Sequence, residues 1–425
     1  MRTPSPPPPS AGLSLLFVVA GALPTWAQAP PPDALSRAGF RISCPRAEGD
    51  TLSSAPAAAP ILAGAVAPVS AFELRFTDSV PAEAEAAIAF AASIWESYLR
   101  SDVPVVVDVD WRDRDDPLVL ASAGPSTLFR DFPGAVPDTW YPVALAEAIA
   151  GEDLNAPGEP DVAIAVNAGA AWYFGTDAAP PRTRTDLVTV ALHELGHGLG
   201  FISSADTVRG VELSLGFTGR FVVYDDFLEA TGRRLTDPGA FANPGELLLA
   251  AVTGADLAFA GPTVLDRNGG AGAPLFSPPT FDAGSSVSHL DEATYPPGSA
   301  EALMTPSLAR GEAAHDPGPL ALALMGDFGW DIRLDLSPAG PPSGVGDLAA
   351  AGVRIAPNPV GSRLTVSGLA ATARGEVTVT DVRGAVVARA TATVLRDGGL
   401  DLAALAPGVY ALRVAGLGVG RFVRR

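Results

Sequence analysis

Two histidines and a glutamate lie close together in a segment whose spacing could support metal chemistry. The segment reads H-E-L-G-H and contains His193, Glu194 and His197. In a helix the two histidines, four residues apart, share one face and can present two imidazole nitrogens to one Zn²⁺. Glu194 then projects beside the metal, where its carboxylate can accept a proton from a metal-bound water whose pKa is about 7. This set of residues is suited to hydrolysis by an activated water.

The sequence around this motif favours the metal site over a chance pair on a solvated helix face. A helix is predicted over 184–200, with Thr185 or Asp186 as N-cap and a close at Gly198 and Gly200. Its other residues are largely apolar. Two histidines and a glutamate in such a helix indicate a partner that compensates their burial.

A catalytic zinc needs a third protein ligand and keeps a fourth position open. The sequence has two other histidines, His289 in S-S-V-S-H-L-D and His315 in E-A-A-H-D-P. His289 is the better candidate, because it comes shortly before A-L-M-T-P, which contains Met304 and looks like a Met-turn. We interpret His315 as a loop residue near the last helix.

Residues 184–331 resemble the leishmanolysin-type branch of the metzincins. The matching pieces are H-E-L-G-H-G-L-G-F, S-H-L-D, L-M and D-F-G-W. The chain departs from the family at Leu290, where an aromatic residue is usual, and Ser203 occupies the place of the third histidine of the compact metzincin signature. The resemblance implies that His193, His197 and His289 are the zinc ligands and that Glu194 is the general base. It also implies that Gly200 makes the turn after the helix and that Met304 forms the hydrophobic floor of the site.

The resemblance therefore implies a zinc endopeptidase acting on protein or peptide substrates. Zn²⁺ is the expected cofactor, and the sequence leaves open whether calcium assists. The main alternative is a surface adhesin or binding protein that keeps a zinc-stabilised metzincin fold without turnover, and another metal-assisted hydrolase is a third. Glu194 favours the enzyme, because a structural site has no use for a base beside an open coordination position.

The elements predicted upstream place this helix in an α+β domain with a mixed sheet. Apolar spacing predicts strands at 72–76, 103–111 and 161–167 and helices at 81–100, 141–150 and 320–328. We expect strand 161–167, with Trp172 and Tyr173, to line the cleft and bind extended substrate by strand addition. The alternative is a buried strand with core aromatics.

The C-terminal sequence changes to short alternating runs separated by Gly and Asp turns, which predicts a small all-β sandwich. A-P-N-P, V-T-V-T-D-V-R-G and the basic end R-F-V-R-R resemble the type A sorting domain of the type IX secretion system. That resemblance implies handling by the secretion machinery and passage through the outer membrane, with removal or lipid attachment at the surface. A carbohydrate-binding or spacer sandwich is the alternative.

The N-terminal sequence indicates export, through a signal peptide whose apolar run at 11–23 is too short to span a bilayer. An uncleaved anchor is the alternative. The Pro- and Ala-rich stretch that follows has little periodicity and is predicted to be flexible. The expected parts are a signal peptide at 1–27, a leader or propeptide at 28–69, a peptidase domain at 70–335, a linker at 336–351 and a sandwich at 352–425.

Cys44, in R-I-S-C-P-R, is the single cysteine, so no intramolecular disulfide can form. Its thiolate could occupy the open zinc position and keep the enzyme latent until the leader is removed. The flanking Arg41 and Arg46 are expected to favour the thiolate. The alternatives are a stray thiol or a lipidation site.

The composition limits the range of partners. The formal net charge is −19 with a pI near 4.5, and every basic residue is Arg. A chain this acidic has no basic patch for phosphates, so a nucleic-acid partner is not expected. After the signal peptide no apolar stretch is long enough for a membrane span. The mature protein is therefore expected to be secreted or attached to the cell surface.

Overall fold

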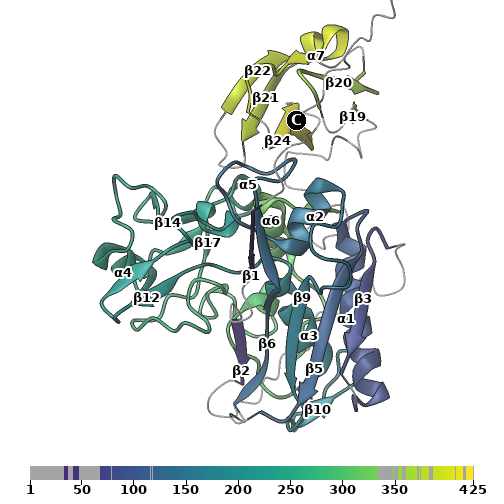
Figure 1. Ribbon diagram of the computed structural model, residues 1–425, viewed down its shortest axis with the longest axis vertical. Helices are drawn as coiled ribbons and strands as arrows, with labels where there is room; N and C mark the ends of the chain where they lie inside the picture. The colour runs from purple at the N-terminus through teal and green to yellow at the C-terminus, as the bar shows by residue number, and fades with distance from the viewer. Residues whose placement is uncertain are drawn as a thin grey trace, which may run out of the picture. The chain divides into compact units, whose positions relative to one another are not determined.

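A computed structural model describes the chain in part. The described residues are 33–36, 42–46, 68–333 without 78, 115 and 117, and then 348, 353–356, 360–370, 373, 375–381, 386–406, 408–414 and 418–424. They form a mixed α/β structure with several sheets and seven α-helices (Figure 1). The predicted signal peptide lies outside them, as does nearly all of the predicted linker.

The central sheet has five strands in the order β2-β6-β9-β5-β3. Its strands are β2 (Ile42–Pro45), β6 (Val119–Pro125), β9 (Val162–Asn167), β5 (Val105–Arg112) and β3 (Phe72–Phe76). The last three are parallel, whereas β6 is antiparallel to β9 and β2 is antiparallel to β6. Valines at alternate positions of β5 are buried, as the period of two in a strand requires. The sheet therefore packs one face against helices.

Helix α1 (Ala82–Tyr98) and helix α3 (Leu187–Gly198) cover this sheet side by side (Figure 1). Helix α1 begins after Pro81, whose missing N–H suits a helix start. Its Trp95 donates from the indole nitrogen to the Leu192 carbonyl at 2.9 Å. This buried hydrogen bond links α1 to α3.

The predicted elements of this domain are confirmed, with ends shifted by a few residues. The remaining long helices are α2 (Val143–Ala150) and α6 (Pro319–Phe328). The indole nitrogen of Trp330, just after α6, donates to the Leu199 carbonyl at the end of α3. Strand β6 was not predicted, because its A-S-A-G sequence lacks the β-branched residues typical of a strand.

The long region after α3 is an insertion of short elements. They are β12 (Asp206–Val208), β13 (Glu212–Ser214), η1 (Val223–Phe227), β14 (Leu228–Ala230), β15 (Arg233–Arg234), α4 (Glu246–Val252), β16 (Ala258–Phe259), α5 (Pro262–Arg267), β17 (Ala273–Pro274) and η2 (Ala302–Met304). Strands β15-β14-β16-β17 make a small antiparallel sheet. Two-residue pairings complete this part of the chain: β4 (Leu99–Arg100) with β18 (Asp331–Ile332), and β10 (Trp172–Tyr173) with β11 (Thr185–Asp186).

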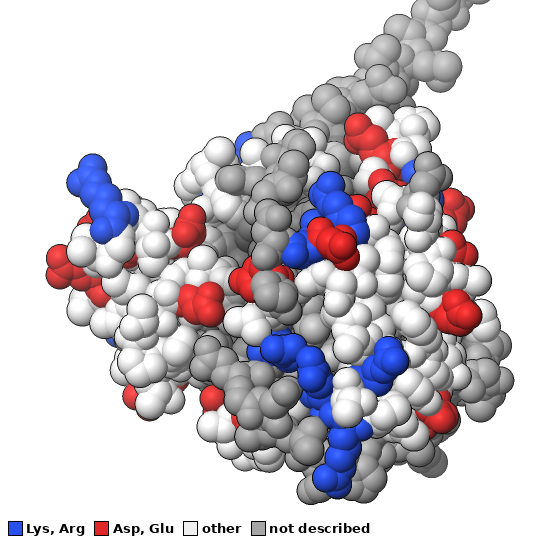
Figure 2. Space-filling view, turned by 90° about the horizontal axis from the view of Figure 1, so that it is seen from below, with Lys and Arg blue, Asp and Glu red and all other residues white. Residues whose placement is uncertain are grey.

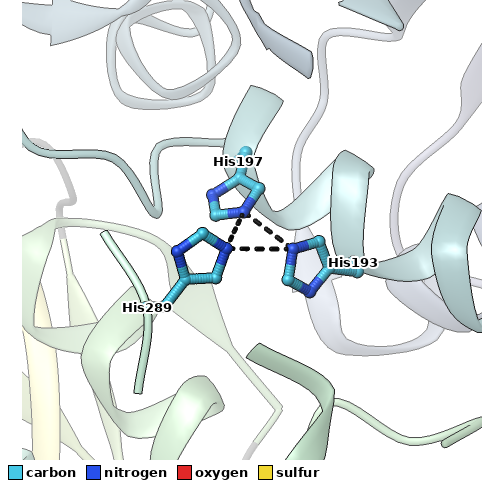
Figure 3. A group of neighbouring side chains, drawn as sticks. All are labelled: His193, His197 and His289. Atoms are coloured by element: carbon cyan, nitrogen blue, oxygen red, sulfur yellow. Dashed lines mark hydrogen bonds between the residues drawn. The ribbon is translucent and has the colours of Figure 1, made fainter. Parts of the chain in front are cut away.

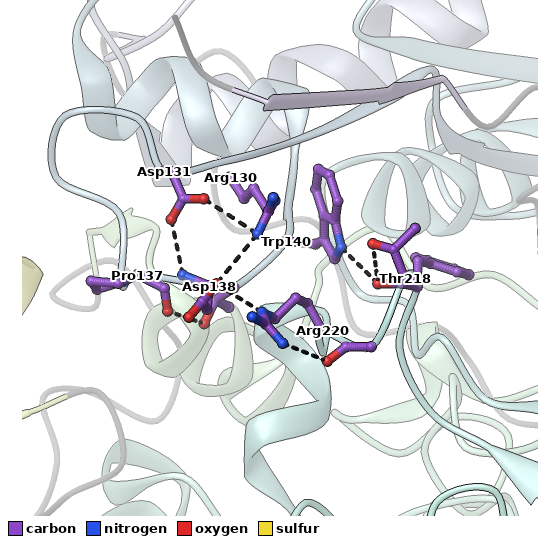
Figure 4. Close-up of polar contacts among 10 residues, drawn as sticks. Arg130, Asp131, Pro137, Asp138, Trp140, Thr218 and Arg220 are labelled. Carbon is purple, nitrogen blue, oxygen red and sulfur yellow. Dashed lines mark hydrogen bonds and ion pairs between the residues drawn. The ribbon is translucent and has the colours of Figure 1, made fainter. Parts of the chain in front are cut away.

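Polar contacts tie the insertion to the loop that precedes α2 (Figure 4). The Asp138 carboxylate lies 2.7 Å from the Arg220 Nε and 3.3 Å from an Arg130 nitrogen. The indole nitrogen of Trp140 donates to the Phe217 carbonyl at 3.0 Å. Exposed ion pairs add little stability individually, so the buried tryptophan is the firmer of these attachments.

The stretch 28–69 contains two strands, which corrects the prediction that this leader is flexible. Strand β1 (Asp33–Ser36) pairs with β7 (Thr127–Arg130), which in turn pairs with β8 (Tyr141–Pro142). Strand β2 extends the central sheet. Both leader strands are held by partners far along the chain, so local periodicity could not reveal them.

The C-terminal part has its own hydrophobic core and is mostly β-structure. Its strands are β19 (Arg354–Ala356), β20 (Arg363–Ser367), β21 (Glu376–Asp381), β22 (Val386–Thr391), β23 (Leu400–Asp401), β24 (Gly408–Val414) and β25 (Gly418–Arg424). They form a sheet ordered β22-β21-β24-β25 and a second ordered β19-β20-β23. The predicted C-terminal β-structure is compatible with this arrangement, to which one short helix, α7 (Ala392–Gly398), is added.

The described surface carries both signs of charge. Figure 2 shows one face, on which arginine and acidic side chains are interspersed. Arg112 and Asp110, for example, are 2.9 Å apart on the surface. Among the helices of the described residues, none has the length and apolar character needed to cross a membrane.

Candidate metal centre

Helix α3 is fixed at its first turn before it reaches the candidate site. Asp186 is the N-cap, as predicted, and its carboxylate accepts from the Thr189 backbone N–H at 2.8 Å. The same carboxylate lies 2.7 Å from Nε2 of His315, and both side chains are fully buried. His315 is a loop residue, as expected, but the sequence did not reveal that it ties the segment before α6 to the start of this helix.

The three histidines converge on one point (Figure 3). Nε2 of His197 lies 2.9 Å from Nε2 of His193 and 3.2 Å from Nε2 of His289, and the third separation is 3.3 Å. All three side chains are buried. The fold therefore brings His289 to His193 and His197 across 92 residues of sequence.

The other ring nitrogen of each histidine faces a backbone carbonyl. Nδ1 of His193 is 2.6 Å from the Leu303 oxygen, Nδ1 of His197 is 2.7 Å from the Phe201 oxygen, and Nδ1 of His289 is 2.8 Å from the Ser285 oxygen. A carbonyl can only accept, so the proton of each neutral ring lies on Nδ1. The three Nε2 atoms then point lone pairs at one another.

Burial keeps these rings neutral. It lowers the pKa of His193 to about 4 and that of His289 to about 3. Burial, followed by the charges of the other two rings, also lowers the pKa of His197. Three converging lone pairs repel one another unless a cation lies between them. Neutral imidazole nitrogens are the donors that Zn²⁺ and neighbouring transition metals prefer.

The spacing also fits a zinc ion. Two nitrogens bound at about 2.0–2.1 Å with tetrahedral angles are about 3.3 Å apart. The observed separations of 2.9–3.3 Å fit this arrangement. The described residues thus provide three ligands whose geometry and protonation match a metal with an open fourth position.

Two glycines shape the backbone around the site. A Cβ on Gly196 would lie 2.9 Å from the Met304 sulfur, so the buried Met304 packs directly beneath the helix. Gly200 has φ +117°, a conformation that favours glycine, and it turns the chain so that the Phe201 carbonyl meets His197. Met304 thus lies beneath the helix and Gly200 at its final turn, and the roles that the resemblance gives them stay predictions.

Glu194 is fully buried beside the histidines. One carboxylate oxygen, a ring nitrogen of His193 and the Cys44 sulfur all lie within 4.8 Å of one another. The Glu194 carboxylate therefore lies beside His193, one of the three converging imidazoles. Cys44, predicted near this site, is placed there by β2.

The strand that carries Cys44 lies between two neighbours. On one side Cys44 pairs with Ala121 of β6, antiparallel. On the other side Arg46 forms a parallel bridge with Leu308, four residues after Met304. Residues 42–46 of the leader thus lie between β6 and the segment after η2, and we call the space that they fill the groove; the Cys44 sulfur lies beside His193.

The environment of the Cys44 thiol is acidic. Burial, followed by the charges of Glu194, Glu312 and Glu292, raises its pKa well above the usual value. These acidic neighbours oppose the expectation that flanking arginines favour the thiolate, which stays a prediction because Arg41 lies outside the described residues.

The expected substrate strand is placed differently. Strand β9 pairs with β5 on one side and β6 on the other, so it offers no free edge, and the prediction of strand addition to β9 is wrong. Trp172 is buried and donates to the Asn167 carbonyl, whereas the Tyr173 hydroxyl is bonded to Asp177. A substrate contact by either side chain stays a prediction.

Sequence reasoning missed the groups that orient the imidazoles. The acceptors are backbone carbonyls of Leu303, Phe201 and Ser285. Every residue has a carbonyl, so no residue type marks these positions. The sequence L-M at 303–304 was the one available signal for such a carbonyl, because η2 supplies both the Leu303 carbonyl and the Met304 side chain.

Comparisons with known proteins match two parts of the chain. Residues 140–214 match a family described as SPBPB7E8-like, a stretch that contains His193, Glu194 and His197 but not His289. Residues 354–418 match the secretion system C-terminal sorting domain. No curated protein and no solved structure matches the chain. Neither family model names a leishmanolysin-type peptidase, so that resemblance stays a prediction.

The match at 354–418 covers most of the strands around the second hydrophobic core. It confirms the resemblance drawn from the alternating runs and the basic end of the sequence. The chain thus carries a type IX secretion C-terminal sorting domain, which implies handling by that secretion machinery and indicates a secreted or cell-surface location.

Proposed function

We propose that this chain is an exported zinc-dependent endopeptidase of the metzincin kind. In this proposal His193, His197 and His289 hold the metal and Glu194 is the general base. The observation that carries it is the convergence of three Nε2 atoms whose rings are protonated at Nδ1. The sorting domain supports the exported location.

Peptide hydrolysis at this site would combine the bound metal with the Glu194 carboxylate. When bound, zinc lowers the pKa of a coordinated water to about 7 and polarises the carbonyl to be cleaved. Glu194 accepts the proton of that water and returns it to the leaving amine. Helix α3 is held at its start by Asp186 and at its end by Trp330, which favours fixed positions for Glu194 and for the two imidazoles on this helix.

The groove occupied by the leader is the proposed path of the substrate. Strand β6 is antiparallel to β2, and the Leu308 segment borders the other side. An extended peptide that replaced β2 could form main-chain hydrogen bonds with β6 and pass over the histidines. Binding of this kind depends on an extended backbone, which suits an endopeptidase acting on flexible protein segments.

The same placement supports the proposal that the leader keeps the enzyme latent. A strand in the groove excludes substrate, and the Cys44 sulfur occupies space beside His193 and Glu194. A thiolate is a strong zinc ligand and would take the position needed by water. Removal of the leader then opens both the groove and the coordination position.

The test of function combines metal content with cleavage. Mass spectrometry of the purified secreted protein identifies the mature N-terminus, and elemental analysis is expected to find about one zinc per chain. Casein cleavage is expected to stop on chelation and to return when Zn²⁺ is added. A protein that binds zinc but cleaves no member of a peptide library would support the adhesin alternative, and one that binds no metal would overturn the proposal.

A further inference from the structure

The segment that carries His289 has an unfavourable backbone conformation. Val287, two residues before the histidine, has φ +71° and is fully buried. Positive φ is disfavoured for a β-branched residue, because its side chain crowds the backbone. The segment keeps this conformation only if its surroundings hold it there.

Two side-chain hydroxyls outside the metal-binding set hold the segment. Tyr224 donates its hydroxyl to the Val287 carbonyl at 3.0 Å. The Ser288 hydroxyl accepts from the backbone N–H of Ser203 at 3.0 Å. Both bonds are buried, so water does not compete for them. They act on the two residues immediately before His289.

Their partners belong to a single braced unit. Tyr224 lies in η1, whose start is fixed where the Val223 N–H donates to the Trp140 carbonyl at 2.9 Å. Its neighbour Asp225 accepts from the Ser203 hydroxyl at 2.7 Å. The loop before α2, drawn in Figure 4, contains Trp140, which connects η1 to the rest of the domain. We call Ser203, Tyr224, Asp225 and Ser288 the His289 clamp.

We propose that the His289 clamp positions the third ligand, and that Tyr224 and Ser288 thereby control how tightly the metal is retained. The inference rests on the proposed function, since it takes the three histidines as the metal site. His193 and His197 are held by their own helix, whereas His289 lies on a loop. Backbone hydrogen bonds with Phe276 hold one side of that loop, and the clamp braces the other side. Loss of one hydroxyl lets the Val287 backbone relax and moves the imidazole away from the other two.

The experiment measures metal affinity in four full-length proteins, each carrying Cys44→Ser so that the thiol does not contribute. They are this parent and its Tyr224→Phe, Ser288→Ala and Tyr410→Phe variants. Tyr410 is the matched control, because its hydroxyl also donates to a backbone carbonyl, that of Ala406, but in the sorting domain. Zinc dissociation constants come from competition with a chromogenic chelator, and Co²⁺-loaded proteins give a ligand-field spectrum.

Tyr224→Phe and Ser288→Ala are each expected to weaken zinc binding about 10–100-fold and to change the Co²⁺ spectrum, as loss of groups that orient ligands typically does. Tyr410→Phe should match the parent. Urea unfolding of the metal-free proteins separates positioning from stability. Variants that unfold more easily but keep the parent affinity and spectrum would overturn the clamp. A parent that binds no metal would overturn the proposed function as well.

Discussion

At the scale of single residues, the candidate site depends on which nitrogen of each imidazole carries the proton. The carbonyls at Nδ1 decide this for His193, His197 and His289, and the three lone pairs then face one another. The arrangement stores electrostatic repulsion that a bound cation relieves. In the proposed metal site, affinity for the metal therefore depends on the carbonyls as much as on the histidines.

Glu194→Gln is expected to keep the zinc and the fold but to lose about 10²–10⁴-fold in peptide cleavage, because an amide cannot accept the proton of the water. Initial rates of casein cleavage measure this loss. Zinc content and the unfolding transition should match those of the wild type. Glu83→Gln, at an exposed position of α1, serves as the control and should cleave normally. If Glu194→Gln cleaves as fast as the wild type, Glu194 is not the base.

At the scale of elements, the strand order supports the proposal that leader and substrate use the same groove. Strand β6 has one edge on β9 and the other on β2. Removal of β2 exposes a strand edge next to the histidines, and such an edge readily takes up another extended chain. In the proposed mechanism, the strand that excludes substrate is thus also the one that covers this edge of β6.

Cys44→Ser tests the leader strand through its single thiol. With the leader verified as intact, the variant is expected to cleave peptides faster than the wild type, because a serine hydroxyl is a far weaker zinc ligand than a thiolate. The control is the pair of proteins after the leader has been removed, which should have equal activity. Equal activity of the two intact proteins would show that the thiol does not enforce latency.

At the scale of the whole molecule, several carboxyls are buried in an already acidic protein. Burial raises the pKa of Glu147, Glu301 and Glu312 to about 7, and that of Asp161 to about 6. Each native carboxyl holds its proton at pH values where the unfolded chain has released it. Stability from these groups is therefore present at acidic pH and is lost as pH rises through the folded pKa values.

Glu147→Gln is expected to flatten this dependence. Between the ordinary pKa of 4.5 and the folded value of about 7, the wild type loses free energy of unfolding at Glu147 as pH rises. Glutamine does not titrate, and its oxygen can still accept from the Leu154 N–H. Urea unfolding of metal-free wild type and variant at pH 4.5 and 7.5 measures the difference. Glu83→Gln should keep the wild-type dependence, and an equal loss in Glu147→Gln would contradict the assignment.

Local patterns in the sequence determined much of helix α3 and its neighbours. The spacing of His193 and His197 and the apolar residues around them depend on one helical repeat, so they can be read without tertiary contacts. The same is true of the alternating strands and of the Asp186 cap. His289 and Met304 came from a family resemblance, and the structure places both at the site.

Only the tertiary structure decided which distant segments meet. The pairing of β2 with β6, the link from His315 to Asp186 and the His289 clamp join residues separated by tens of positions or more. Backbone carbonyls orient the imidazoles, and they are the same in every residue type. Such contacts are set by how the whole chain packs, and no local periodicity or residue identity specifies them.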